Sequence, residues 1–280
     1  MRSLRATISE AGITAVRRAV GIGAVTAMNE ASSLGKMWST ALQIALPLCV
    51  TVLLWRGLYA ATPVVAGVPH DQAVTYAVLA ALLTYLRTAN RTWFRDAVVQ
   101  HVHTGTIVYW FLRPISPARY HLLRAAGDLA YSLAWVLPAY VICLAAGAVT
   151  GPADPVAGSW AAVSFAFGQV IVYLIGLLLD LSCFWTLVNE QIIRMVGFIQ
   201  TLLSGGFAPL WFFPDWFQTL SQLLPFQAIV NIPMSVYTGR IHGEALWWNL
   251  ALQSFWCVLL GAVACVLWPR AASRLEVQGG

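Results

Sequence analysis

Residues 155–179 read PVAGSWAAVSFAFGQVIVYLIGLLL and contain no charged side chain. The stretch lies between Asp154 and Asp180. An α-helix rises about 1.5 Å per residue, so about 20 helical residues cross the hydrocarbon core of a bilayer. Residues 155–179 are therefore long and apolar enough to form a membrane-spanning helix, and they are the clearest sign of the fold.

Uncharged stretches of similar length recur along the chain, at 37–55, 129–153, 195–213 and 245–268. A sixth span is expected at 72–93, because Arg87 and Arg91 can extend from its end to the lipid headgroups. The composition agrees, since the chain is 59% hydrophobic and 10% charged, whereas a soluble domain carries about 25% charged residues. We therefore predict an all-α integral membrane protein with six transmembrane helices.

The basic residues are distributed unevenly over the expected loops. If both termini and the segments 87–124 and 180–194 are cytoplasmic, 14 of the 16 Lys and Arg residues lie inside, and only Arg56 and Arg240 lie outside. This bias is typical of a bacterial inner-membrane protein, so we predict that both termini are cytoplasmic. It also explains the net charge of +5 without a nucleic-acid partner, because no basic, aromatic-interleaved polar face is present.

The charge pattern divides the chain into three parts. Residues 1–35 mix apolar and charged positions and suit an amphipathic helix that lies on the membrane lipid. Residues 36–270 form the expected transmembrane domain. Residues 271–280 form a short cytoplasmic tail.

The segment at about 94–117 joins the second and third expected spans and lies on the cytoplasmic surface. We expect a surface helix that ends before Arg113 and Pro114, and a new helix that begins at Pro117, because Ser116 can cap free amides and proline fits a first helical turn. Such a segment suits transmission of movement from a cytosolic partner. The alternative is an ordinary basic loop that binds anionic headgroups.

The segment at about 214–240 does not fit a simple span. Its uncharged part is long enough to cross, but Pro225 and Pro233 interrupt helical hydrogen bonding. Its amide side chains would be costly against lipid, and these are Gln218, Gln222, Gln227 and Asn231. We therefore predict a re-entrant pair of short helices before the sixth span.

No group of residues predicts enzyme chemistry, a metal site or a bound cofactor. The five cysteines are isolated from one another. Asp128 and Asp180 are expected at span ends, where arginines or headgroups satisfy them, whereas an intramembrane enzyme or a proton-coupled carrier would need such groups at membrane depth. The chain lacks the G-x-x-x-x-G-K-S/T phosphate loop, so ATP is not expected to bind to it.

Three stretches resemble the ABC-2 type permeases, in particular a branch of paired bacterial permeases. The first is FRDAVVQHVHTGTIVYWFLRPISPARYHLLRAAGD at 94–128, with an arginine before a surface helix and an L-R-P turn. The second is CFWTLVNEQIIRMVGFIQTLLSGGFAPLWFFPDWFQTLSQLLPF at 183–226, with a glycine pair and a P-L-x-x-x-P exit. The third is IVNIPMSVYTGRI at 229–241.

The resemblance implies a permease subunit that pairs with an identical or related permease and docks on two cytosolic ABC ATPases, which hold the ATP and Mg. Its expected cargo is an amphipathic small molecule, drug, lipid or natural product, exported by alternating access. The ATPase-coupling residues would be Arg95, Leu112, Arg113 and Pro114. The outer gate and re-entrant segment would contain Gly205, Gly206, Pro209, Pro214, Pro225 and Pro233. The alternatives are a proton-coupled secondary carrier and a membrane anchor without transport activity.

Overall fold

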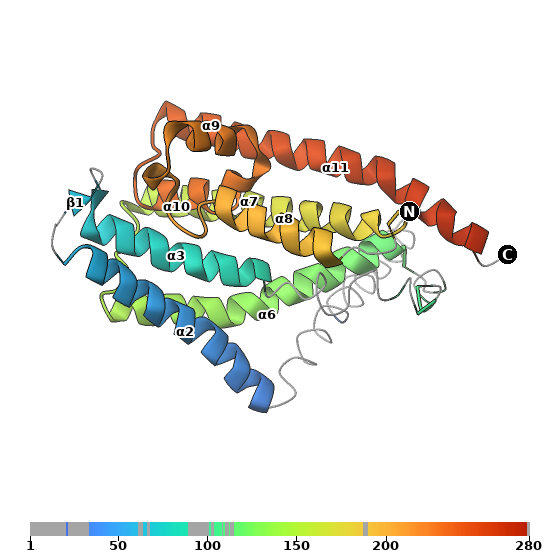
Figure 1. Cartoon of the computed structure of the whole chain (residues 1–280), viewed down its shortest axis with the longest axis horizontal. Helices are drawn as coiled ribbons and strands as arrows, with labels where there is room; N and C mark the ends of the chain where they lie inside the picture. The colour runs from blue at the N-terminus through green and yellow to red at the C-terminus, as the bar shows by residue number, and fades with distance from the viewer. Residues whose placement is uncertain are drawn as a thin grey trace, which may run out of the picture. The chain divides into compact units, whose positions relative to one another are not determined.

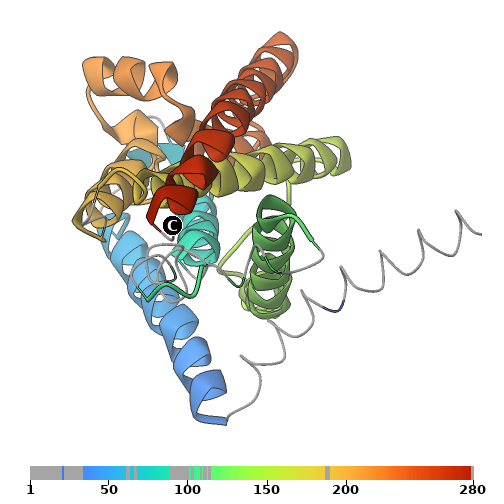
Figure 2. The ribbon, with the colours of Figure 1, turned by 90° about the vertical axis from the view of Figure 1, so that its right-hand side faces the viewer.

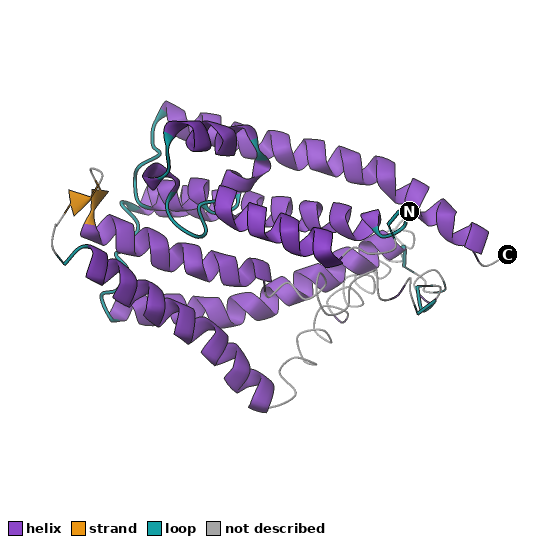
Figure 3. Cartoon of the chain, in the orientation of Figure 1, coloured by secondary structure: helices purple, strands orange, loops and turns teal. Residues whose placement is uncertain are grey.

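A computed structural model shows an all-helical chain with one short β-hairpin among the residues that it describes (Figures 1 and 3). These residues are 21, 34–60, 64–65, 68–88, 101, 104–107, 109, 112, 115–186 and 190–278. The longer helices are α2 (Leu34–Leu58), α3 (His70–Thr88), α6 (Pro117–Ala145), α7 (Pro155–Ser182), α8 (Glu190–Leu203) and α11 (Glu244–Gln278). The shorter elements are β1 (Val64–Val65), β2 (Val68–Pro69), η1 (Leu210–Phe212), α9 (Asp215–Leu223), η2 (Pro225–Ala228) and α10 (Asn231–Tyr237).

The chain divides into two compact units. Residues 43–88 and 136–280 form the larger unit, and residues 1–42 and 89–135 belong to the smaller one. The larger unit holds α3 and every element from α7 to α11. The functional elements described below all lie in this larger unit.

Among the described residues, four helices are long and apolar enough to cross a membrane: α2, α6, α7 and the part of α11 from Glu244 to Ser273. Their lengths are 25, 29, 28 and 30 residues. Helix α7 begins at Pro155, as the sequence predicted, and the Asp154 side chain accepts a hydrogen bond from the Ala157 amide at its start. An all-helical membrane protein is therefore confirmed, whereas six crossings remain a prediction.

Helix boundaries differ from the expected spans at two places. Helix α6 begins at Pro117, as expected, but it ends at Ala145, eight residues before the expected end of the third span at 153. Helix α8 ends at Leu203, ten residues short of the expected end of the fifth span at 213. Uncharged composition does not reveal this stop, because the turn that causes it consists of small, neutral residues.

Helix α3 occupies the expected second span but is more polar than the four apolar helices. It has 19 residues and begins with His70 and Asp71. Every residue from Ala73 to Ala80 is buried within the protein, on all sides of the helix. A helix that other parts of the chain surround does not need an apolar surface toward lipid, which explains how α3 accommodates Thr75 and Tyr76.

The larger unit is built on the pairing of α7 with α11. Their shared core contains Leu177 and Leu181 of α7 and Ala264 and Ala271 of α11. Small alanines on one helix facing leucines on the other allow close helix packing. Figure 2 shows α11 in red lying against α7 in yellow-green.

Candidate functional site

The predicted outer-gate glycines form the turn that ends α8. Gly205 has φ of 77°, a left-handed conformation that favours glycine. The Gly206 amide donates to the Thr201 carbonyl at 3.2 Å, and the Gly205 amide donates to the Leu202 carbonyl at 3.4 Å. This pairing satisfies carbonyls at the helix end and turns the chain away from the helix axis.

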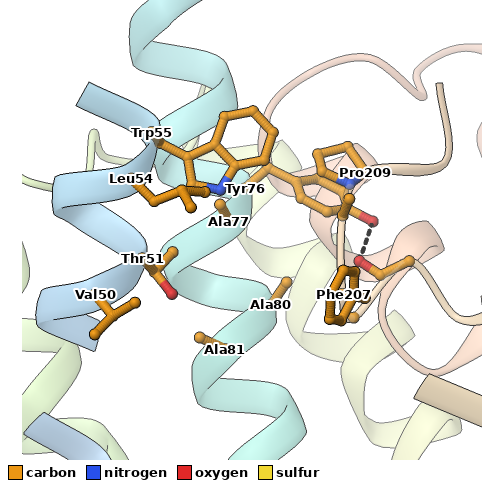
Figure 4. A pocket seen from close by; sticks show the side chains of 13 residues that line it. Val50, Thr51, Leu54, Trp55, Tyr76, Ala77, Ala80, Ala81, Phe207 and Pro209 are labelled. Atoms are coloured by element: carbon orange, nitrogen blue, oxygen red, sulfur yellow. Dashed lines mark hydrogen bonds between the residues drawn. The ribbon is translucent and has the colours of Figure 1, made fainter. Parts of the chain in front are cut away.

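Tyr76 of α3 lies against this turn and was not among the predicted site residues. Its side chain is fully buried, and its hydroxyl lies 3.3 Å from the Gly205 carbonyl (Figure 4). The same hydroxyl lies 3.2 Å from Oδ1 of Asn231. A Cβ at position 205 would lie 2.5 Å from that hydroxyl. Glycine is therefore required here for contact with Tyr76 as well as for the turn.

The same contact joins three segments that are far apart in the sequence. The Asn231 amide, at the start of α10, donates to the Ser204 carbonyl at 3.0 Å. The Tyr76 and Trp211 rings meet edge to face with centroids 4.6 Å apart. We call the group formed by Tyr76, Gly205 and Asn231 the latch. The Tyr76 hydroxyl has one proton, which it shares between the Gly205 carbonyl and the Asn231 side chain.

A charged residue lies beside the latch. The Arg240 guanidinium stacks over the Trp211 ring, 4.3 Å from its centroid. Arg240 is exposed and follows α10. A cation held over an indole face stabilises the ring position, so Arg240 supports Trp211 and, through it, the packing of Tyr76.

The η2 segment packs against α7 and α11. Gln253 of α11 is fully buried, and its amide nitrogen donates to the carbonyls of Ser164 at 3.1 Å and Ala228 at 2.8 Å. A Cβ at Gly168 would lie 3.0 Å from the Ala228 oxygen and 3.2 Å from the Ile229 oxygen. We call this group, with Gly168, Gln253, Ser164 and Ala228, the clamp.

A small cavity opens beside the latch. Its volume is about 110 Å³. The walls come from residues 50–55 of α2, residues 76–81 of α3 and residues 205–209 (Figure 4). Gly205, Gly206 and Pro209 from the predicted set line it, so the structure brings three predicted residues together at this place.

The four predicted prolines all lie at starts of short helices. Pro209 precedes η1, Pro214 precedes α9, and Pro225 is the first residue of η2. Pro233 is the third residue of α10. Backbone amides in a first helical turn have no acceptor within the helix, so proline costs nothing at these positions.

The predicted coupling residues fall in the smaller unit. Arg95, Arg113 and Pro114 lie outside the described residues. Leu112 is described, and 73% of its surface is exposed. Their coupling role therefore remains a prediction.

In the part of the chain that the structure describes, no group of three or more His, Cys, Asp or Glu side chains could hold a metal ion. Asp180, which we expected at a span end, lies in the last turn of α7 and is buried.

Sequence reasoning missed the partners of the glycines. Tyr76, Gly168 and Gln253 each look ordinary in an apolar helix. One signal was available, because a polar amide in a membrane helix needs an internal partner, and that rule points to Gln253 directly. Asn231 was noted as costly against lipid, and its buried partner Tyr76 explains how the cost is avoided.

Comparison with known proteins supports a transport role. A family model described as ABC-2 family transporter protein matches residues 45–279. A search of curated proteins finds no match. The family is the membrane component of transport systems that associate with ABC ATPase components, and the four apolar helices agree with a multi-pass membrane permease. On this match, which covers most of its length, the chain belongs to the ABC-2 family of transporter proteins.

Proposed function

We propose that this chain is the permease subunit of an ATP-driven exporter in the bacterial inner membrane. Two cytosolic ATPases would bind ATP and Mg, and an identical or related permease would complete the transport path. The cargo would be an amphipathic small molecule, drug, lipid or natural product. The family match over residues 45–279 is the observation that carries this proposal.

The latch is suited to the outer gate of such an exporter. Outward opening requires the turn after α8 to move relative to α3, and the Tyr76 hydroxyl makes a polar contact between them. Because the single proton of the Tyr76 hydroxyl is shared between Gly205 and Asn231, breaking this contact costs little free energy. The orientation follows from the charge bias, which places Arg240 near the outer surface.

The six-span topology is part of the same proposal. Helix α3 would cross as a protein-enclosed span, and α8 with the turn at Gly205 would complete the fifth crossing. Helices α9 and α10 would form the re-entrant pair in the outer leaflet, with both termini in the cytoplasm. Four helices long enough to cross and the 14-to-2 distribution of basic residues support this arrangement.

The coupling segment at about 94–117 would receive the movement of the ATPases. Arg113 is the residue for the test, because its guanidinium suits a carboxylate on a cytosolic partner. The test is purification of the protein in mild detergent from its native membrane, followed by measurement of ATP hydrolysis. Wild-type protein should bring down a soluble ATPase, and Arg113→Glu should release it or make its hydrolysis insensitive to the permease.

Arg56→Glu is the matched control, because it reverses one charge at the end of α2 that we place outside the membrane. It should leave the ATPase bound. Purification without any ATP-binding partner would contradict the exporter assignment and favour the carrier or anchor alternatives.

A further inference from the structure

The cavity beside the latch has walls of small side chains on α3. Ala77, Ala80 and Ala81 line one wall, and their spacing places them on one face of the helix. Residues 205–209 form the opposite wall. The hollow therefore results from residue size on α3, and a larger side chain there would fill it.

The lining of the cavity carries no charge. Thirteen residues line it, and the only side-chain hydroxyls among them belong to Thr51 and Tyr76. The Tyr76 hydroxyl already lies within hydrogen-bond distance of Gly205 and Asn231. An occupant would therefore be held by shape and apolar contact and not by an ionic group.

The rim of the cavity is continuous with the outward surface of α2. Val50 is 55% exposed, Leu54 is 54% exposed, and Phe207 is 78% exposed. In the apolar window of α2 only 11% of residues are buried within the protein. In a bilayer, these rim side chains face hydrocarbon, so the medium at the mouth of the cavity is lipid chains.

We propose that the cavity holds a segment of the acyl chain of a bilayer lipid. A cavity of about 150 Å³ can hold a molecule the size of benzene, so this cavity of about 110 Å³ has room for a few methylene groups of a lipid chain. A chain seated there contacts Gly206 and Pro209, next to the Tyr76–Gly205 contact. The lipid chain then supports the position of the turn after α8 against α3. This inference concerns lipid binding alone and does not depend on the exporter assignment.

The test uses a photoreactive lipid. The full-length protein is reconstituted in vesicles of phosphatidylethanolamine and phosphatidylglycerol with a trace of phospholipid that carries a diazirine on its acyl chain. After irradiation, adducts are mapped by peptide mass spectrometry. Because Ala73 to Ala80 are buried on every side of α3, adducts at the lining residues Tyr76, Ala77 and Ala80 require a chain that has entered the cavity.

We expect adducts at Tyr76, Ala77 and Ala80 of the wild-type protein. Ala80→Phe fills the cavity and should reduce this labelling several-fold. Val258→Phe adds the same ring at a 72% exposed position of α11 and should leave it unchanged. Phe207 is 78% exposed, so its labelling should be the same in all three proteins. If Ala80→Phe fails to elute as folded protein, Ala81→Leu at the partly exposed edge of the same wall replaces it.

Two outcomes would overturn the proposal. The first is labelling of exposed α2 positions with none at Tyr76, Ala77 and Ala80. The second is labelling of these lining residues that a folded cavity-filling variant does not reduce. Either result would show that lipid chains pass over the mouth without entering.

Discussion

The latch and the clamp both hold the segment from Gly205 to Asn231, the latch against α3 and the clamp against α7 and α11, and their contacts differ in kind. At the clamp, both amide protons of Gln253 are used, and backbone atoms of Ala228 and Ile229 lie directly on Gly168. At the latch, one hydroxyl proton of Tyr76 serves two acceptors. The comparison indicates a segment fixed to α7 and α11 and releasable from α3.

The largest expected effect comes from loss of the close approach at the clamp. Gly168→Ala would place a Cβ 3.0 Å from the Ala228 oxygen, and because backbone and not a flexible side chain must move, we expect a loss of about 3 kcal/mol in the free energy of unfolding. The measurement is unfolding of the purified protein by titration of denaturing detergent.

Gly261→Ala is the control for that substitution. Gly261 also lies inside a membrane helix, but the nearest side-chain atom to its added Cβ is 4.0 Å away. We expect no loss, and a gain of up to about 1 kcal/mol from reduced backbone freedom. Equal losses for the two variants would remove the special role of Gly168.

The second effect concerns the clamp hydrogen bonds. Gln253→Leu keeps the volume but removes both donors from buried carbonyls, so we expect a loss of about 2 kcal/mol. Ser254→Ala removes only a bond to the Leu250 carbonyl within the same helix and should change stability little. Native-state hydrogen exchange at 226–230 should rise in Gln253→Leu only.

The third effect separates latch from clamp. Tyr76→Phe removes a shared hydrogen bond and should lower the free energy of unfolding by about 1 kcal/mol. Hydrogen exchange should rise at 204–209 and remain unchanged at 226–230, because only the latch is broken. An equal rise in hydrogen exchange at 204–209 and 226–230 would mean that both regions open together. The distinction between a releasable latch and a fixed clamp would then be wrong.

Tyr140→Phe is the matched control for Tyr76→Phe. The Tyr140 hydroxyl also pairs with a buried group, the Tyr237 hydroxyl at 2.8 Å, but it does not contact the turn after α8. It should leave exchange at 204–209 as in the wild type. Faster exchange at 204–209 in Tyr140→Phe would mean that the increase in Tyr76→Phe reflects a loss of stability of the whole protein and not loss of the latch.

The smallest expected effect is at the edge of the latch. Arg240→Gln removes the cation over Trp211, and at this exposed position we expect a loss of about 0.5 kcal/mol. Arg240→Lys should retain part of the stabilisation, because a lysine ammonium is also attracted to the face of an indole ring. Thermal shift of the three proteins at low and high salt measures the difference.

Much of the fold follows from patterns that act locally. A proline after a capping residue places the starts of α6 at Pro117 and α7 at Pro155, and apolar length identifies four helices. The early end of α8 was missed, because Gly205 is neutral and its left-handed backbone shows only in the folded chain. Asp128 lies inside α6, which begins at Pro117 as expected, and its place at the membrane end of the third span stays a prediction.

The sequence alone determines that the chain enters a membrane and that four of its helices are long and apolar enough to cross it. These properties depend on composition and on spacing along a single helix or turn. Only the tertiary structure decides that Tyr76 meets Gly205 and Asn231, 129 and 155 positions away, and that Gln253 reaches Ala228. Such contacts depend on which helix faces pack together, and that choice is made by the whole core and not by any one stretch.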